Sequence, residues 1–169
     1  MLNNVNEAIA NYQKSIKLNP SKPESHYNLG NAFCIKQDFK NAASAYEKTL
    51  ALDEKNGLAF YNLGNAYYMM NQPKQSIDPY KKCLKLNESS PECHFNLANA
   101  YLEIGESSKA LHHFKQCLKY DKHNPDCFFN IGKILEKENN KDEAWKAYQK
   151  TLKYNPEHEK AKEKLSKLF

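Results

Sequence analysis

A chain of 169 residues with five glycines, 40% hydrophobic and 27% charged residues has the composition of an ordinary globular protein, not of a disordered or collagen-like one. No apolar run approaches the roughly 20 residues that span a bilayer, and Met1–Asn4 lacks the apolar core of a signal peptide. The formal net charge of +5 permits weak attraction to acidic partners without identifying one. We therefore expect a soluble, cytoplasmic protein with no membrane partner.

The first 22 residues are expected to be half of a helical hairpin, its second helix without the first. Five of their residues match residues found 34 positions later: Ala8, Tyr12, Ser15, Ile16 and Leu18 correspond to Ala42, Tyr46, Thr49, Leu50 and Leu52. An unpaired helix of this kind leaves Ile9 and Ile16 on an open apolar face. That face could pair with another copy of the chain.

A seven-residue phrase then recurs four times at a period of 34 residues. Its copies begin at Tyr27, Tyr61, Phe95 and Phe129, and the first reads Tyr-Asn-Leu-Gly-Asn-Ala-Phe. A fixed period of this length is typical of a solenoid of stacked helix pairs, because one pair alone cannot bury its apolar side. We divide the chain into repeats 23–56, 57–90, 91–124 and 125–158, each with a helix A followed by a helix B. We expect 159–169 to be a C-terminal capping helix with a polar outer face.

Local signals place the ends of these helices. Proline is tolerated in a first turn, so Pro23, Pro91 and Pro125 mark the start of helix A in three repeats. Helix B is expected to follow Asp38, Gln72, Glu106 and Asn140, and to run to Leu52, Leu86, Tyr120 and Tyr154. Pro79 lies inside helix B of the second repeat, where it removes a backbone donor. We expect a kink or a late helix start there.

Small residues recur where helices A and B must approach closely. Four on helix A are expected to face four on helix B: Gly30, Gly64, Ala98 and Gly132 face Ala42, Ser76, Ala110 and Ala144. The cysteines also follow the period, since Cys83 and Cys117 are 34 apart, as are Cys93 and Cys127. Without a Cys-x-x-Cys pair or zinc-like spacing, we interpret the five cysteines as small packing thiols and expect neither metal nor cofactor.

The repeated residues resemble the tetratricopeptide repeat family over nearly the whole chain. The second repeat carries its pattern at Phe60, Leu63, Gly64, Tyr67, Ser76, Tyr80, Cys83 and Glu88, and the fourth at Phe128, Ile131, Gly132, Leu135, Ala144, Tyr148, Thr151 and Pro156. His26 and His94 depart from it at the first aromatic position, and Glu54, Glu88 and Lys122 replace the closing proline. The resemblance implies an all-α, right-handed superhelical solenoid of antiparallel helix pairs. It also implies a protein–protein interaction scaffold whose helices A line a concave, peptide-binding groove.

Twelve residues on helix A are expected to face this groove: Tyr27, Asn28, Asn31, Tyr61, Asn62, Asn65, Phe95, Asn96, Asn99, Phe129, Asn130 and Lys133. A side-chain amide has two donors and an acceptor, so a row of asparagines could recognise the main chain of an extended peptide. The row is similar to the asparagine ladder in the repeats of O-linked N-acetylglucosamine transferase. The alternative is that these amides bond within the protein and that the aromatic residues pack on neighbouring helices.

The charges of the groove favour a neutral to basic peptide. The second position of helix A holds Glu24, Leu58, Glu92 and Asp126, whereas the lysine rows lie on helix B. The family's clamp for acidic chaperone tails needs cations, but its basic positions here hold Tyr27, Glu92 and Asn96. The lysine rows lack interleaved aromatic residues and read as a solvated helix face, so nucleic acid is not expected as a partner.

No arrangement of catalytic side chains stands out, and we expect no enzyme activity. His112 and His113 are adjacent and point in different directions on a helix, and no phosphate-binding loop or nucleophile motif is present. The leading hypothesis is a scaffold that binds an extended peptide. The alternatives are an assembly module that self-associates through residues 1–22, and a targeting module of a larger enzyme.

Overall fold

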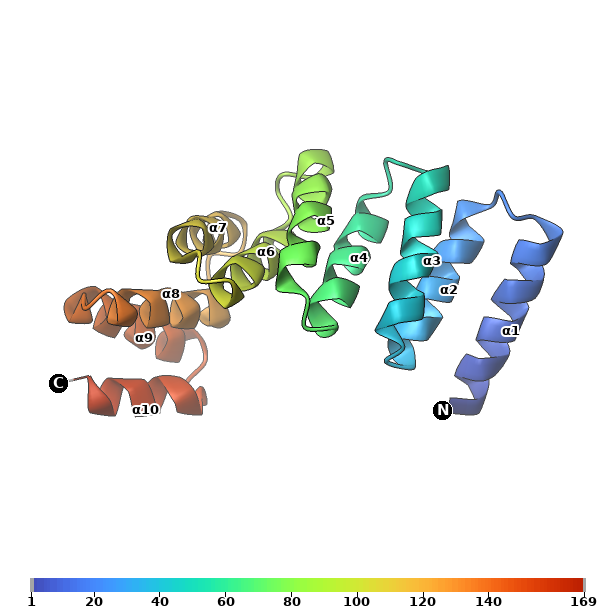
Figure 1. Cartoon of the computed structure of the whole chain (residues 1–169). Coiled ribbons are helices and arrows are strands. Elements are labelled where there is room, and N and C mark those ends of the chain that lie inside the picture. Colours follow the sequence, from blue (N-terminus) through green and yellow to red (C-terminus); the bar gives the residue numbers. More distant parts are fainter. Residues whose placement is uncertain (1, 169) are drawn as a thin grey trace. The chain divides into compact units, whose positions relative to one another are not determined.

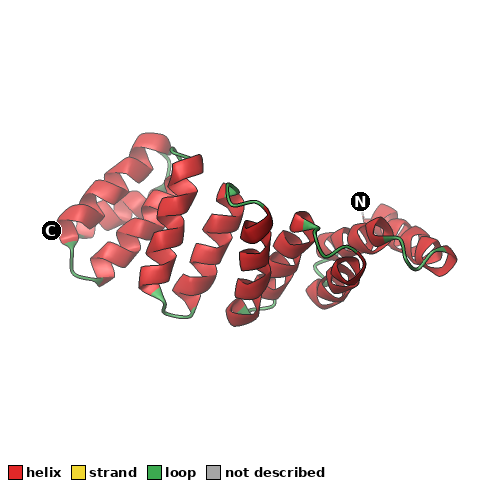
Figure 2. Ribbon diagram, turned by 90° about the horizontal axis from the view of Figure 1, so that it is seen from above, coloured by secondary structure: helices red, strands yellow, loops and turns green. Residues whose placement is uncertain are grey.

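The computed structural model describes residues 2–168, and side chains from Asn4 onward. These residues form ten α-helices and no strand, and Figure 2 shows the helices joined by loops. Their bounds are α1 Leu2–Leu18, α2 Pro23–Ile35, α3 Phe39–Leu52, α4 Gly57–Met69, α5 Pro73–Leu86, α6 Pro91–Glu103, α7 Ser107–Tyr120, α8 Pro125–Lys137, α9 Lys141–Tyr154 and α10 Glu159–Lys167. The predicted all-α repeat of helix pairs is confirmed. The residue expected at the end of the capping helix, Phe169, lies outside the described residues.

The chain divides into two units, one up to Glu88 and one from Ser89 onward. In unit 1, α2 packs on α3 and α4 on α5, while α1 covers α2 and α3 covers α4. In unit 2, α6 packs on α7 and α8 on α9, and α10 covers α9. Successive helices are joined by short turns and alternate in direction (Figure 1). Even-numbered helices α2 to α8 are therefore helices A, and α3 to α9 are helices B.

Each turn from helix A to helix B passes through a left-handed residue. Gln37, Asn71, Gly105 and Asn139 have φ angles of 60°, 59°, 81° and 60°. After the first of them, the amide of Asp38 donates to the carbonyl of Phe33 at 2.9 Å, which closes the helix as in a Schellman motif. Asp38 and Asn140 then cap helix B by accepting from the amides of Asn41 and Glu143. Both predicted caps are confirmed.

Pro79 does not delay its helix. Helix α5 begins at Pro73, where the missing amide hydrogen has no role, and continues through Pro79 to Leu86. The predicted late start is therefore wrong, and the kink stays a prediction. Pro79 is buried, so its ring contributes to packing in exchange for the backbone donor that it lacks.

The glycines of helix A make room for an aromatic ring of helix B. A Cβ atom added to Gly30 would lie 2.6 Å from Tyr46, and the same distance separates Gly64 from Tyr80 and Gly132 from Tyr148. The nearest neighbour is therefore this ring, and the prediction that Ala42 and its equivalents fill this role is wrong. In the third repeat Ala98 occurs with Phe114, and both side chains are fully buried.

The open face predicted for the N-terminal helix is already covered. Ile9 is only 9% exposed and packs with Leu29, Ala32 and Ala45, and Ile16 packs against the same cluster. The prediction failed because periodicity shows which side of a helix is apolar and not which neighbour covers it. No helix within residues 2–168 combines the length and apolarity required to cross a membrane.

Candidate peptide-binding site on helices A

The candidate site of unit 1 is a set of hydrogen-bonded amides and tyrosines on α2 and α4. Asn62 donates through Nδ2 to the hydroxyl of Tyr27 at 3.1 Å and to Oδ1 of Asn31 at 3.2 Å. Tyr46 of α3 donates its hydroxyl hydrogen to the same Oδ1 at 2.8 Å. Burial raises the pKa of Tyr46, so this hydroxyl stays a donor at physiological pH. The structure thus brings three predicted residues together and adds Tyr46.

These bonds determine what the two amides still offer to a ligand. Both Nδ2 hydrogens of Asn62 are used, so its remaining capacity is that of an acceptor. Oδ1 of Asn31 accepts two bonds, so its remaining capacity is that of a donor. One peptide group has one N–H and one C=O, which are the complements of these two atoms. The cluster therefore orients a donor and an acceptor toward the same cleft.

The cleft itself has a volume of about 290 Å³ and is lined by Asn31, Asn62 and Asn65 together with Cys34 and Tyr46. Two apolar residues, Ile35 and Met69, stand at its edge, 67% and 60% exposed. We did not predict these two, although both follow the repeat at one position. Exposed apolar side chains beside polar groups are typical of a recognition surface.

The aromatic residue before each helix A asparagine packs within its own repeat. Tyr27 lies 5.9 Å from Tyr46, Tyr61 lies 6.2 Å from Tyr80, and Phe95 and Phe129 make the equivalent pairs with Phe114 and Tyr148 at 5.8 and 5.7 Å, all between ring centroids. All four rings are half-buried, so one part packs on helix B and another remains accessible. The alternative that these rings pack on a neighbouring helix therefore holds for that part.

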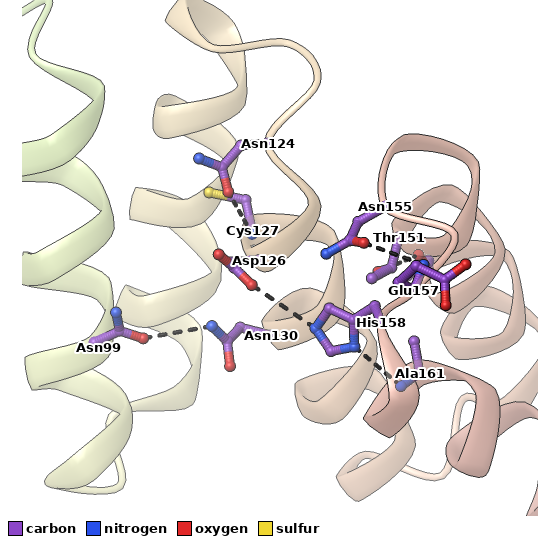
Figure 3. A network of polar contacts seen from close by, with 11 residues as sticks. Asn99, Asn124, Asp126, Cys127, Asn130, Thr151, Asn155, Glu157, His158 and Ala161 are labelled. Atoms are coloured by element: carbon purple, nitrogen blue, oxygen red, sulfur yellow. Dashed lines mark hydrogen bonds and ion pairs between the residues drawn. The ribbon is translucent and has the colours of Figure 1, made fainter.

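Unit 2 has a looser amide pair and more charge at the equivalent positions. Asn130 donates to Oδ1 of Asn99 at 3.5 Å, and Figure 3 shows the two side chains pointing toward each other from α8 and α6. Phe114 occupies the tyrosine position and has no hydroxyl to donate. Lys133 replaces the last asparagine and lies over the ring of Phe129 at 5.9 Å. Lysine here is exposed, unlike the half-buried asparagines.

The missing asparagine of the fourth repeat is replaced by a carboxylate. Tyr148 donates to Oε2 of Glu136 at 2.6 Å, and Lys164 of α10 approaches the same oxygen at 2.9 Å. Burial alone would raise the pKa of Glu136, but the bonds from Tyr148 and Lys164 hold it below its ordinary value. The carboxylate therefore stays charged and connects α8 with the last helix.

A histidine reaches the acidic edge of unit 2. His158 caps α10 by accepting from the amide of Ala161 through Nδ1, and its Nε2 lies 3.7 Å from Oδ1 of Asp126 (Figure 3). Its ring also packs 4.5 Å from Phe129, between centroids. Asp126 is thus partly engaged, whereas the side chain of Glu24 at the same position of the first repeat is exposed.

Histidines and cysteines elsewhere serve packing. His94 is 5% exposed, and its Nδ1 lies 3.1 Å from Nδ1 of His113, a pair that we did not predict. Cys117 and Cys127 are buried with sulfurs 2.9 Å apart, and this hydrogen bond together with burial raises the pKa of the Cys127 thiol. Among residues 2–168, no three His, Cys, Asp or Glu side chains are placed to hold a metal ion.

Three family models match successive parts of the chain. A tetratricopeptide repeat model matches 2–34, the model of anaphase-promoting complex (cyclosome) subunit 3 matches 35–117, and that of YpiA-like C-terminal tetratricopeptide repeats matches 91–158. Together they extend over all four helix pairs. The chain belongs to the tetratricopeptide repeat family. Among curated proteins no sequence matches it.

Solved tetratricopeptide repeat structures resemble the chain over most of its length. YrrB, described as a tetratricopeptide repeat protein with an unusual peptide-binding site, is 28% identical with a TM-score of 0.87, covering 95% of this chain and 83% of its own. MamA is 26% identical with a TM-score of 0.87, covering 94% and 91%. PilF of Pseudomonas aeruginosa, at 20% identity and a TM-score of 0.80 with 94% and 72% covered, shows the shared fold. These neighbours support a protein-interaction scaffold.

Proposed function

We propose that this tetratricopeptide repeat protein binds an extended peptide segment of a partner protein on its helices A. The observation that carries the proposal is the amide pair of unit 1, in which Asn31 retains a donor and Asn62 an acceptor beside one cleft. Two amides that are already fixed by tyrosine hydroxyls lose little side-chain entropy when a peptide binds. YrrB, whose description names a peptide-binding site, supports the same function.

The bound segment is proposed to carry apolar side chains and neutral or basic ones. Ile35 and Met69 supply exposed apolar area at the cleft, and Glu24 supplies an exposed carboxylate on α2. In unit 2, Phe95, Asn96, Asn99, Phe129, Asn130 and Lys133 are proposed to serve the same purpose. There the unit offers Lys133 together with Glu92 and Asp126, so its preference for basic segments is weaker.

A peptide-array screen followed by fluorescence anisotropy tests the proposal. Asn62→Ala removes the acceptor and is expected to weaken the best peptide by about tenfold, or about 1.4 kcal/mol. Asn11→Ala is the matched control, because Asn11 is an exposed asparagine on α1, outside the candidate site. Equal affinity of wild type and Asn62→Ala would refute the role of the amide pair.

Cysteine protection gives an independent measurement. Cys34 lines the cleft and is half-buried, and burial raises its pKa, so alkylation is slow but measurable. A peptide seated in the cleft is expected to slow the alkylation of Cys34 and to leave that of the buried Cys127 unchanged. Binding without protection of Cys34 would move the site away from this cleft.

A further inference from the structure

A second groove lies in unit 2, on the side formed by helices B. It has a volume of about 910 Å³ and lies between α7 and α9, above α8, and extends to Leu165 of α10. Its apolar surface comes from Leu111 and Leu118 of α7 and from Ile131 and Leu135 of α8. We call it the α7–α9 groove. The volume and apolar lining are those of a binding site, and the site just proposed on helices A does not include it.

Unit 1 contains the same groove in a nearly closed form, which shows what opens it. The equivalent space, 68 residues earlier in the sequence, is lined by Phe60, Leu63 and Tyr67 and has a volume of about 290 Å³. There Tyr67 donates its hydroxyl hydrogen to Glu47 on α3, which draws the tyrosine across the gap. Leu135 and Lys115 occupy these two positions in unit 2 and cannot form the bond.

The charges at the edge of the α7–α9 groove also differ from those of its counterpart. In unit 1, Asp78 and Lys82 neutralise each other at 2.9 Å. The equivalent residues of unit 2 are Lys146 and Lys150, and Lys115 and Lys153 add two more positive charges. One carboxylate, Glu143, offsets them through a 2.7 Å contact with Lys146. The edge is therefore strongly positive around an apolar floor.

We propose that the α7–α9 groove receives an amphipathic, acidic helix of a partner protein. Lys146, Lys150 and Lys153 follow one another at i, i+4 and i+7, so they form a row of roughly 10 Å along α9. A helix that lies along this row can place leucine-type residues on the floor and carboxylates against the lysines. Charge complementarity selects such a partner and excludes basic helices.

A second copy of this chain does not fit the groove. Its first helix α1 carries Lys14 and Lys17 against a single Glu7, and α10 carries more lysines than glutamates. Both would bring positive charge to a positive edge. The partner is therefore a different protein.

The test uses the full chain and a fluorescent 18-residue helical peptide with leucines on one face and glutamates beside them. Binding is measured by anisotropy, and a peptide with lysines in place of the glutamates serves as the ligand control. Lys150→Glu is expected to weaken binding by about tenfold or more, since it reverses one charge of the row. Lys48→Glu, the same change at the equivalent repeat position of unit 1, is expected to alter it by less than about twofold.

A second variant tests the opening of the groove directly. Leu135→Tyr combined with Lys115→Glu restores the pair that closes the groove in unit 1 and is expected to abolish binding. Should it fail to fold, as judged by circular dichroism, the exposed Lys150→Glu still decides the matter. Equal losses from Lys150→Glu and Lys48→Glu, or equal binding of the two peptides, would overturn the proposal. Binding of phosphatidylglycerol vesicles without binding of the acidic peptide would overturn it as well.

Discussion

The two units solve the same packing problem with different chemistry on helices A. In unit 1, the hydroxyls of Tyr46 and Tyr80 donate to Asn31 and Asn65 at 2.8 and 2.7 Å. In unit 2, Phe114 has no hydroxyl, and Tyr148 donates to the carboxylate of Glu136. The ring that fills the space is therefore the constant requirement of the fold, and the atom at its tip is free to change with the surface that the unit presents.

The largest effect is expected when this ring is removed. Tyr46→Ala and Phe114→Ala both delete a side chain that is at most 1% exposed, and each is expected to lower the free energy of unfolding by about 3–5 kcal/mol. Urea unfolding measures both values. A loss below about 1 kcal/mol at Phe114 would show that the ring is dispensable in unit 2.

Opposite substitutions at the facing position are both expected to destabilise. Gly64→Ala places a methyl group 2.6 Å from the buried ring of Tyr80 and is expected to lower the free energy of unfolding by about 1–3 kcal/mol. Ala98→Gly removes a buried methyl group and loosens a helix, with an expected loss of about 1 kcal/mol. Thermal unfolding compares the pair. A gain in stability from Gly64→Ala would mean that the tyrosine moves aside freely.

The hydroxyl alone is expected to have a moderate effect in unit 1. Tyr46→Phe reproduces the residue that unit 2 uses naturally, but it removes one of the two bonds to Oδ1 of Asn31. We expect a loss of about 1 kcal/mol in the free energy of unfolding, and weaker peptide binding because Asn31 is less firmly oriented. Unchanged binding would separate the ring's structural role from the candidate site.

The smallest effect is expected from Glu136 and depends on pH. Its pKa is lowered in the folded state, so its stabilisation is present above the ordinary value of about 4.5 and is lost as pH falls through the lowered pKa. Glu136→Gln is expected to flatten the acid side of the stability profile and to change stability at pH 7 by less than about 1 kcal/mol. Parallel acid limbs for the two proteins would contradict this role.

The repeat period predicted the helices well because it reports a local property. Asp38 and Asn140 lie where their side chains cap helix B, and both were recognisable in the sequence. The twelve candidate site residues were placed on helix A by the same argument, and their role in peptide binding stays a prediction.

What the period could not predict are contacts between particular side chains. The bond from Tyr67 to Glu47 and the pair His94–His113 each join residues about 20 positions apart. A period shows which face a residue occupies, whereas these contacts depend on the identity of both partners at once. The failed prediction for Ile9 has the same origin, since a single helix cannot show that its neighbour already covers it.

The left-handed residues that end each helix A have a practical consequence for engineering. Only the third repeat uses glycine there, at Gly105, and the first uses Gln37, whose Cβ makes this conformation unfavourable by roughly 1 kcal/mol. Gln37→Gly is thus a candidate for raising the melting temperature without touching either binding surface, and asparagine, which tolerates this conformation, makes the second and fourth repeats poorer targets.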